Sequence, residues 1–413
     1  MTARSVIDAF AHKMTTTMYG NPHSENKPAR VSGDMVDEVR ARTLAFLGAD
    51  PRYFDLVFVA NATAAIKLVA DAFRDLSEKS RTRSFWYGYH KDAHTSLVGV
   101  REFANRDVHC FETDEQVDAW LADPLGSSPG FIRRTYPQGL GLFAYPGQSN
   151  LNGRRLPLRW LRKLRASPYL QNTYTLFDAA ALAMTTPMST VFADPAAAPD
   201  FTCVSFYKIF GFPDLGGLVV RKDSGHILTL RKYFGGGTVT MVSAVGEQWH
   251  KSKGAEAAVV TTHHDAHGAA RAVASAPYSL HDGLEDGTLP FHSILALGEA
   301  VSVHARLYGS MENISRHTTR LGEMLHRRVA GLCHPNGRPV CRVYSDCEGF
   351  GDPSRQGSTI ALNVVRADGS FVAYSDVERL ANERGIYIRS GGKFLLHGPS
   401  VMSLVTGNGK ALS

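Results

Sequence analysis

The stretch that decides the fold is residues 201–221, which read FTCVSFYKIFGFPDLGGLVVR. Its first six residues form a short apolar run and predict a buried strand. Lys208 follows at once, then a turn rich in glycine and proline, and residues 218–221 predict a second strand. A lysine rarely faces inward at the end of a buried strand unless it is paired. Held there, it can form a Schiff base with a carbonyl compound. A surface lysine whose amine reaches solvent is an equally good interpretation of this residue alone.

Asp178 lies thirty residues upstream of Lys208, at the end of another apolar run, residues 174–177. In parallel α/β sheets, ligands bind at the carboxyl ends of the strands, so both side chains are expected in one crevice. A carboxylate beside a lysine suits pyridoxal phosphate, because the lysine binds the aldehyde and the carboxylate keeps the pyridine nitrogen protonated. The other interpretation of Asp178 is a helix N-cap.

Around these two residues, short apolar runs alternate with helical patterns. This order predicts βαβ units, a mostly parallel sheet and an α/β fold. Strands are expected at residues 55–60, 84–89, 142–145, 174–177, 201–206 and 218–221, and helices at 34–46, 62–73 and 156–165. Residues 359–388 return to a strand, helix, strand pattern.

An anion site is expected where the first of these strands meets the following helix. Ala62 and Thr63 begin that helix, and backbone N–H groups and a hydroxyl at a helix N-terminus suit a phosphate. Ser205, three residues before Lys208, would supply another hydroxyl. Ordinary N-capping is the alternative, and it is compatible with phosphate binding.

Composition excludes several classes of protein. The 413 residues are 44% hydrophobic and 20% charged, which is globular composition. The formal charge of +6 is small for this length and gives little support to a nucleic-acid partner. The N-terminal segment lacks the apolar core of a secretory signal, and no apolar run approaches the ~18 residues that span a bilayer. We therefore expect a cytoplasmic protein without a membrane partner.

The cysteines and histidines do not predict a metal site. The five cysteines include no CxxC pair, which indicates a reducing compartment and ordinary thiols. Residues 263–267, HHDAH, carry three histidines, but their spacing does not place them on one helical face. We interpret this segment as a polar loop and expect no metal.

Seven motifs together point to a known family: YGNPHSENKPA, FVANATAAIKLVADAF, DAHTSLVGVRE, FAYPGQSNLNGRRLPL, FDAAALAMTT, SFYKIFG and EDGTLPFHSILALGEA. Through them the chain resembles, from about Tyr19 to about Gly391, the cysteine-desulfurase-like domain of molybdenum cofactor sulfurases. That domain belongs to the class V aminotransferases of pyridoxal-phosphate fold type I. The resemblance implies a large domain over residues 31–294 and a small domain made of residues 1–30 and 295–413.

The resemblance also implies a role for each matching residue. Lys208 would bind the pyridoxal 5'-phosphate aldehyde, and His94 would stack on the ring and move protons, unless it is an ordinary helix-capping histidine. The remaining cofactor-binding positions would be Ala62, Thr63 and Ser205 at the phosphate, Tyr207 in the place of a phosphate-binding histidine, Gln148 and Asn150 near the ring hydroxyl, Asp178 at the pyridine nitrogen, and Thr288 at the phosphate of a neighbouring subunit. A homodimer is therefore expected.

Two departures from the family pattern bear on the reaction. Cysteine desulfurases of this type carry a nucleophilic cysteine soon after an RTG or RSG element, and aligning residues 389–391 with it puts Phe394 at that place. After this loop, relatives have an arginine that binds the substrate carboxylate, and a molybdenum-cofactor-binding domain follows; neither is found here. Arg389 is the remaining candidate for the carboxylate, its alternative being a structural arginine at a strand end.

These observations predict an enzyme that uses pyridoxal phosphate and acts on a small amino acid containing sulfur. Without the persulfide-forming cysteine, a C–S lyase acting by β-elimination is the more natural reaction. Other β-chemistry, such as decarboxylation, and aminotransfer remain alternatives. A non-catalytic relic that keeps the fold is the rival from a different class.

Overall fold

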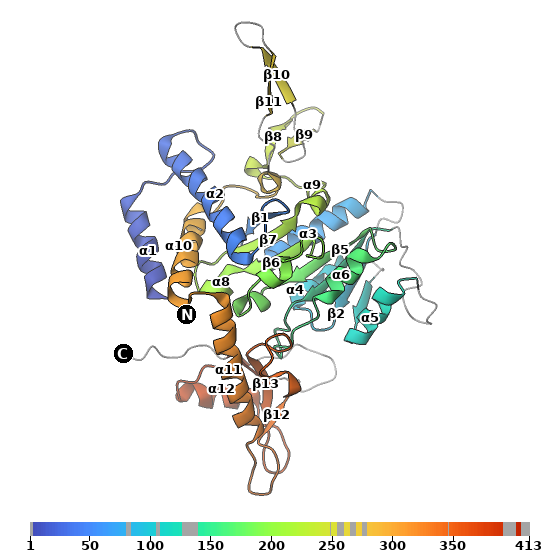
Figure 1. Ribbon diagram of the computed structural model, residues 1–413, viewed down its shortest axis with the longest axis vertical. Coiled ribbons are helices and arrows are strands. Elements are labelled where there is room, and N and C mark those ends of the chain that lie inside the picture. Colours follow the sequence, from blue (N-terminus) through green and yellow to red (C-terminus); the bar gives the residue numbers. More distant parts are fainter. Residues whose placement is uncertain are drawn as a thin grey trace.

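The computed structural model describes residues 3–79, 84–104, 108–125, 139–247, 249–253, 260–264, 270–274, 279–345, 347–390 and 402–405. For residues 260–264, 270–274, 347 and 402–405 the structure describes the backbone alone. A seven-stranded sheet forms the centre of the molecule (Figure 1).

The central sheet is mostly parallel, as the sequence predicts. Its order is β1 (Phe54–Val59), β7 (Gly216–Arg221), β6 (Phe201–Ser205), β5 (Thr173–Asp178), β4 (Gly141–Pro146), β2 (Trp86–His90) and β3 (Val108–Phe111). Only β7 runs antiparallel to its neighbours β1 and β6. The strands β6, β5, β4, β2 and β3 therefore end at the same edge, which carries the carboxyl end of β5 and β6 side by side.

The two faces of the sheet have separate apolar cores. In β5, Leu176 belongs to one core and Phe177 to the other, as the two-residue period of a strand requires. The Phe177 face is covered by α1 (Arg4–Thr16), α2 (Lys27–Leu47), α5 (Asp114–Ala122), α6 (Arg159–Ala166) and α10 (Phe291–Tyr308). The Leu176 face is covered by α3 (Ala62–Ser77), α4 (Thr95–Val98) and α9 (His226–Thr229).

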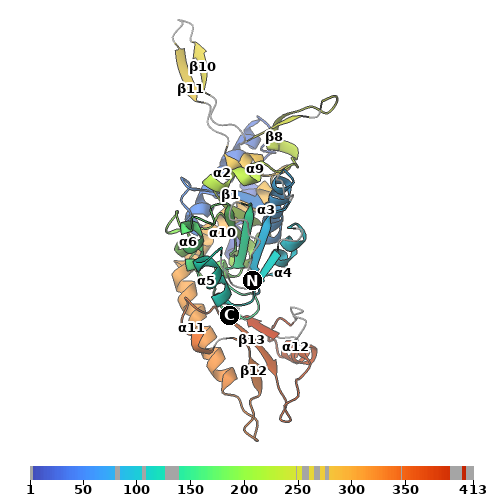
Figure 2. The same ribbon diagram turned by 90° about the vertical axis from the view of Figure 1, so that its right-hand side faces the viewer.

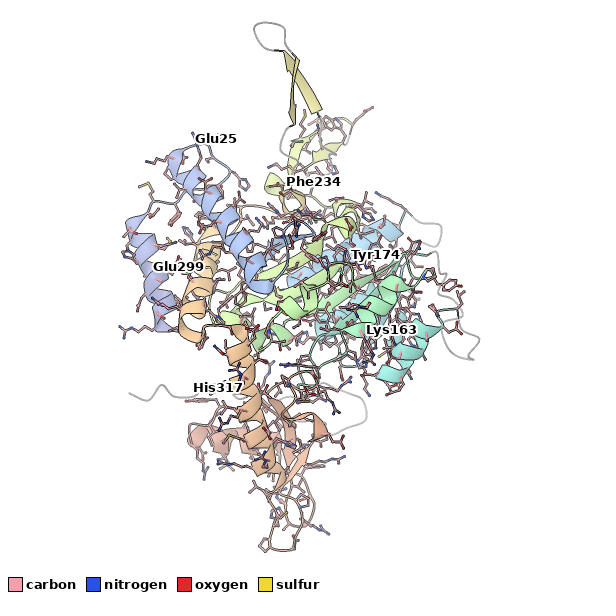
Figure 3. All side chains as sticks on the ribbon, in the orientation of Figure 1. Glu25, Lys163, Tyr174, Phe234, Glu299 and His317 are labelled. Carbon is pink, nitrogen blue, oxygen red and sulfur yellow. The ribbon has the colours of Figure 1, made fainter. Side chains whose placement is uncertain are left out.

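Ion pairs join some of these helices at the surface. Lys13 of α1 lies 2.7 Å from Glu299 of α10, which Figure 3 labels. Lys163 of α6, also labelled, lies 2.7 Å from Asp118 of α5. Because the lysine of each pair is exposed, most of the stabilisation of the helices comes from the apolar cores beneath them.

Two hairpins project from one end of the molecule, as Figures 1 and 2 show from two directions. They are β8 (Val239–Val242) with β9 (His250–Ser252), and β10 (Val260–His264) with β11 (Ala270–Ala274). Phe234, at the base of the first hairpin in Figure 3, stacks on His250 with ring centroids 4.1 Å apart. The sequence pattern does not predict either hairpin. The expectation of a polar loop at residues 263–267 is wrong for residues 263 and 264, which lie in β10; their side chains and residues 265–267 lie outside the described part of the chain.

The opposite end is formed by residues 310–345, 347–390 and 402–405, which we call the C-terminal lobe (Figures 1 and 2). It contains α11 (Met311–Ala330), α12 (Tyr374–Glu383) and a three-stranded sheet of β12 (Cys341–Val343), β13 (Thr359–Val364) and β14 (Met402–Val405). The prediction of a strand just before residue 388 is wrong. The strand that pairs with β13 at this edge is β14. The division of the chain into residues 31–294 and the remainder stays a prediction.

The C-terminal lobe meets the central sheet at what we call the interlobe junction, residues 148–155 against 352–359. Two backbone hydrogen bonds join the loops there, from Arg155 N to Arg355 O and from Gly357 N to Gly153 O, each 2.8 Å. Gln356 Nε2 donates to Asn152 O at 2.7 Å. The junction thus places the lobe against the loop that follows β4.

Candidate functional site

Lys208 lies on a single helical turn, α8 (Phe206–Phe210), that begins directly after β6. Phe206 and Phe210 anchor the turn in the core, and Gly211 ends it with a left-handed φ of 80° that favours glycine. Burial lowers the pKa of Lys208; the Asp178 charge opposes this, and the Arg389 charge adds to it. The amine is therefore partly desolvated, and more of it is neutral at a given pH than in an exposed lysine.

Asp178 is the last residue of β5, and its register partner on β6 is Cys203. Its side chain is only 7% exposed, and Oδ1 accepts a hydrogen bond from Ala180 N at 2.9 Å. No second hydrogen-bond partner for this carboxylate occurs within the described ranges. Asp178 ends β5 and Lys208 follows the neighbouring strand β6, and the Asp178 charge acts to raise the pKa of Lys208 against the effect of burial.

The first turn of α3 forms a cluster of polar groups beside α8. Ala62 N donates to Ser205 Oγ at 3.2 Å, while Asn61 caps the helix by accepting from Ala64 N. A close approach makes this possible: a Cβ on Gly216 would lie 2.5 Å from the Asn61 Cα atom. Glycine at the start of β7 therefore lets the β1–α3 turn lie against β6 and brings the helix N-terminus to the end of the sheet.

Thr63 and His94 meet through a residue that the sequence analysis did not single out, Ser96. Thr63 Oγ1 lies 2.8 Å from Ser96 Oγ, which lies 3.0 Å from His94 Nδ1. His94 also caps α4 by accepting from Ser96 N at 3.2 Å. His94 is therefore the N-cap of α4, as the alternative interpretation expects, and this position is compatible with a role at the cofactor. No sequence signal marked Ser96, because its contact with Thr63 is tertiary.

Gln148 lies in the loop after β4 and is 5% exposed. Its Oε1 accepts from Arg155 Nε at 3.1 Å. Burial lowers the pKa of Arg155 to about 10, and the nearby Asp352 charge opposes the shift. Asn150, two residues further on, is an exposed turn residue. Gln148 is thus fixed by the interlobe junction, whereas no hydrogen bond to the Asn150 side chain occurs in the described chain.

The other three predicted residues lie at the edge of this arrangement. Tyr207 is 41% exposed and, with Lys208, lines a pocket of about 130 Å³ between α8, α1 and α10. Arg389 is exposed on the C-terminal lobe but close enough to act on the Lys208 pKa. Thr288 is exposed and follows Gly287, whose N–H donates to Gly235 O at 3.2 Å, and no hydrogen bond within the described residues joins Thr288 to the others. Phe394 lies outside the described residues.

The donor set fits pyridoxal phosphate. Hydroxyls and backbone N–H groups at the N-terminus of the 16-residue helix α3 suit a phosphate. A desolvated amine suits an aldehyde, and a buried carboxylate with an unused oxygen suits a protonated ring nitrogen. The residues come from the ends of β1, β5 and β6 and from α4, so the central sheet holds the whole set.

The family model described as Aminotransferase class-V matches residues 1–403. The chain belongs to this family. Its members are enzymes that use pyridoxal phosphate, so the predictions of family, fold, enzyme class and cofactor are confirmed. No helix in the described ranges is long and apolar enough to span a membrane.

Curated relatives of this class-V chain are named molybdenum cofactor sulfurase. Those from Aspergillus oryzae and Aspergillus niger are 49% identical over 389 and 390 residues. Each alignment covers 94% of this chain and 43% of the relative, so the chain spans less than half the length of these relatives.

Solved structures show the same fold at low sequence identity. The cysteine desulfurase from Thermococcus onnurineus has a TM-score of 0.66 and 16% identity, covering 98% of this chain and 86% of that one. The cystine C-S lyase C-DES, in complex with its product cysteine persulfide, has a TM-score of 0.66 and 15% identity, covering 98% and 90%. Both place this class-V chain in the pyridoxal-phosphate fold type I.

Proposed function

We propose that this chain is a C–S lyase that removes sulfur from a sulfur-containing α-amino acid by β-elimination. The observation that carries the proposal is the meeting, at the ends of β5 and β6, of a desolvated lysine, a buried aspartate and a hydroxyl cluster at the start of α3. Pyridoxal phosphate, when bound, withdraws electrons from the amino-acid Cα, which makes its proton acidic.

Each residue has a proposed role that follows from its chemistry. Lys208 would hold the aldehyde when the cofactor is bound, and its amine could move the Cα proton, because its lowered pKa leaves part of it neutral. Asp178 holds the proton on the ring nitrogen, and Ala62 N, Thr63 and Ser205 hold the phosphate. His94 packs against the ring.

The remaining proposed contacts concern the substrate and a second subunit. Gln148 and Asn150 lie near the ring hydroxyl, and Arg389 binds the substrate carboxylate by a bidentate ion pair. Tyr207 contacts the phosphate, and Thr288 reaches the phosphate of the other subunit in a homodimer. The homodimer and a cytoplasmic location are part of the proposal.

The sequence favours a lyase over a desulfurase at one position. Sulfur transfer needs a thiolate that attacks the substrate sulfur, and the aligned position holds Phe394. Cys203 cannot replace it, since it is 0% exposed and burial raises its pKa well above the ordinary value, with the Asp178 charge adding to the shift. In β-elimination the C–S bond breaks without a protein thiol: cysteine and water give pyruvate, ammonia and sulfide.

A cysteine desulfurase is the second candidate, and the 49% identity to molybdenum cofactor sulfurases favours it. The products separate the two reactions. Cysteine, supplied to the purified chain, gives pyruvate in a lyase, but alanine and a protein persulfide in a desulfurase. Cysteine conjugates and aspartate, assayed in parallel, test the other β-chemistry and aminotransfer; a relic gives no product from any of them.

The cofactor site itself is tested by trapping. The chain, supplied with pyridoxal phosphate, should absorb visible light, and borohydride should fix the cofactor on Lys208, as located by peptide mass spectrometry. Lys208→Ala should abolish the adduct. The control is Lys67→Ala, which removes a lysine 68% exposed on α3 and should leave the adduct intact. An adduct elsewhere, or none, refutes the proposal.

A further inference from the structure

Ser96 joins two groups that the proposed function assigns to different parts of the cofactor. Its Oγ lies 2.8 Å from Thr63 Oγ1 at the start of α3 and 3.0 Å from His94 Nδ1 at the start of α4. The hydroxyl therefore bridges the candidate phosphate-binding threonine and the candidate ring-stacking histidine.

The direction of these hydrogen bonds follows from the backbone. Ser96 N–H donates to His94 Nδ1 at 3.2 Å, so Nδ1 carries no proton. A neutral imidazole then carries its proton on Nε2. Facing an unprotonated Nδ1, the Ser96 hydroxyl is the donor in its contact with the ring.

The same reasoning assigns the proton of Thr63. A hydroxyl has one proton to donate, and that of Ser96 is used on His94. In the contact between the two hydroxyls, Thr63 is therefore the donor and Ser96 the acceptor. When an anion occupies the N-terminus of α3, the Thr63 proton can turn to it and the Ser96 proton can turn to Thr63 Oγ1, because the Ser96 N–H alone still donates to His94 Nδ1.

We propose that Ser96 is a positioning residue, which fixes His94 as the Nε2–H tautomer and orients the Thr63 hydroxyl at the phosphate seat. The inference rests on the proposed function for the identity of the ligand. Ser96 acts through its two partners, so the loss of its hydroxyl should weaken cofactor binding only while Thr63 is present to be oriented.

The chain offers a matched control beside Ser96. Thr95 belongs to the same turn of α4 and is exposed, and its hydroxyl makes no hydrogen bond within the described chain. Thr95→Ala therefore changes a hydroxyl of the same helix without touching the bridge. Ser96→Thr keeps the hydroxyl and serves as the conservative variant.

The first experiment measures the tautomer on the full chain without cofactor. Imidazole nitrogen NMR at a pH where His94 is neutral should show the proton on Nε2, with the resonances assigned by their loss in His94→Gln. A proton on Nδ1 would overturn the inference. This measurement needs no cofactor, so it is decisive even if trapping on Lys208 fails and the proposed function falls.

The second experiment measures the dissociation constant of pyridoxal phosphate by absorbance titration. Ser96→Ala should weaken binding roughly fivefold, the effect of about one net hydrogen bond. Thr95→Ala and Ser96→Thr should each stay within about twofold of the parent chain.

The decisive comparison is made in a Thr63→Ala background. There, adding Ser96→Ala should change the dissociation constant of pyridoxal phosphate by less than about twofold. An equal, additive loss in both backgrounds would overturn the inference, as would identical effects of Ser96→Ala and Thr95→Ala. If Ser96→Ala does not fold, Ser96→Gly takes its place in the same cycle.

Discussion

Gly357→Ala tests whether the interlobe junction holds Gln148 in place. A Cβ on Gly357 would lie 2.4 Å from Gln148 Oε1, 2.7 Å from Cδ and 2.8 Å from Nε2. The amide must therefore move. It is the end of a flexible side chain, but it is 5% exposed and bonded to Arg155 Nε at 3.1 Å, so its movement costs that hydrogen bond.

The magnitude follows from these contacts. Overpacking a tight site costs ~1–3 kcal/mol, and a lost hydrogen bond ~1 kcal/mol. Because the displaced group is a side-chain end and not backbone, we expect the lower part of that range. Gly357→Ala should lower the free energy of unfolding by about 1–2 kcal/mol. It should also weaken pyridoxal phosphate binding, since Gln148 is proposed to lie near the ring.

Urea unfolding of the two variants and the parent chain measures the effect. The control, Gly33→Ala, adds a Cβ inside α2 with nothing within 4 Å, so it should stabilise the protein by about 0.5–1 kcal/mol. In a Gln148→Ala background, Gly357→Ala should cost much less, because the obstructing amide is gone. An unchanged stability of Gly357→Ala, or the same cost in both backgrounds, would refute the reasoning.

Three further results are expected. Asp178→Asn keeps the acceptor for Ala180 N but loses the charge at the ring nitrogen. The activation free energy of turnover should rise by ~3 kcal/mol, while the circular dichroism spectrum stays unchanged. Near-normal turnover would mean that Asp178 is only a helix cap. Burial alone would raise the pKa of Asp114, but hydrogen bonds and charges from His90 and Arg154 hold this pKa well below its usual range. The Asp114 carboxylate therefore stabilises the folded protein above the unfolded pKa of about 4, and this stabilisation is lost as the pH falls further. Asp114→Asn should therefore cost ~2 kcal/mol in urea unfolding at pH 7 and less below pH 4, and a gap independent of pH would contradict this. Incubation with cysteine should leave no persulfide on any of the five cysteines by mass spectrometry, whereas one that disappears in Lys208→Ala would make the chain a desulfurase.

The sequence predicted the centre of the fold and the core of the site because both follow from local pattern. Asp178 and Lys208 each follow an apolar run, and the carboxyl ends of parallel strands share one edge, so their proximity needed no knowledge of side-chain packing. The N-terminus of α3 was found for the same reason, since Ala62 and Thr63 stand where a strand gives way to a helix.

What the sequence did not predict depends on contacts between distant segments. Ser96 reaches Thr63 across 33 positions, and nothing in the pattern near either residue signals the bridge. The strand before residue 388 was expected from the strand, helix, strand pattern of residues 359–388, but β13 pairs with β14 instead. A short apolar run specifies a tendency to pair, and the partner is chosen by the tertiary structure.

The attachment of the C-terminal lobe has a mechanical consequence. Between α10 and α11 the chain turns at Gly309, where φ is 73° and ψ is −58°, and the interlobe junction is a second point of attachment. Within the described residues, these two attachments fix where the lobe stands relative to the central sheet. Lys208 lies on the central-sheet side of these attachments and Arg389 lies on the lobe side, so the attachments set the separation of the two charges. Because the Arg389 charge lowers the pKa of Lys208, the place of the lobe bears on the amine of the central sheet.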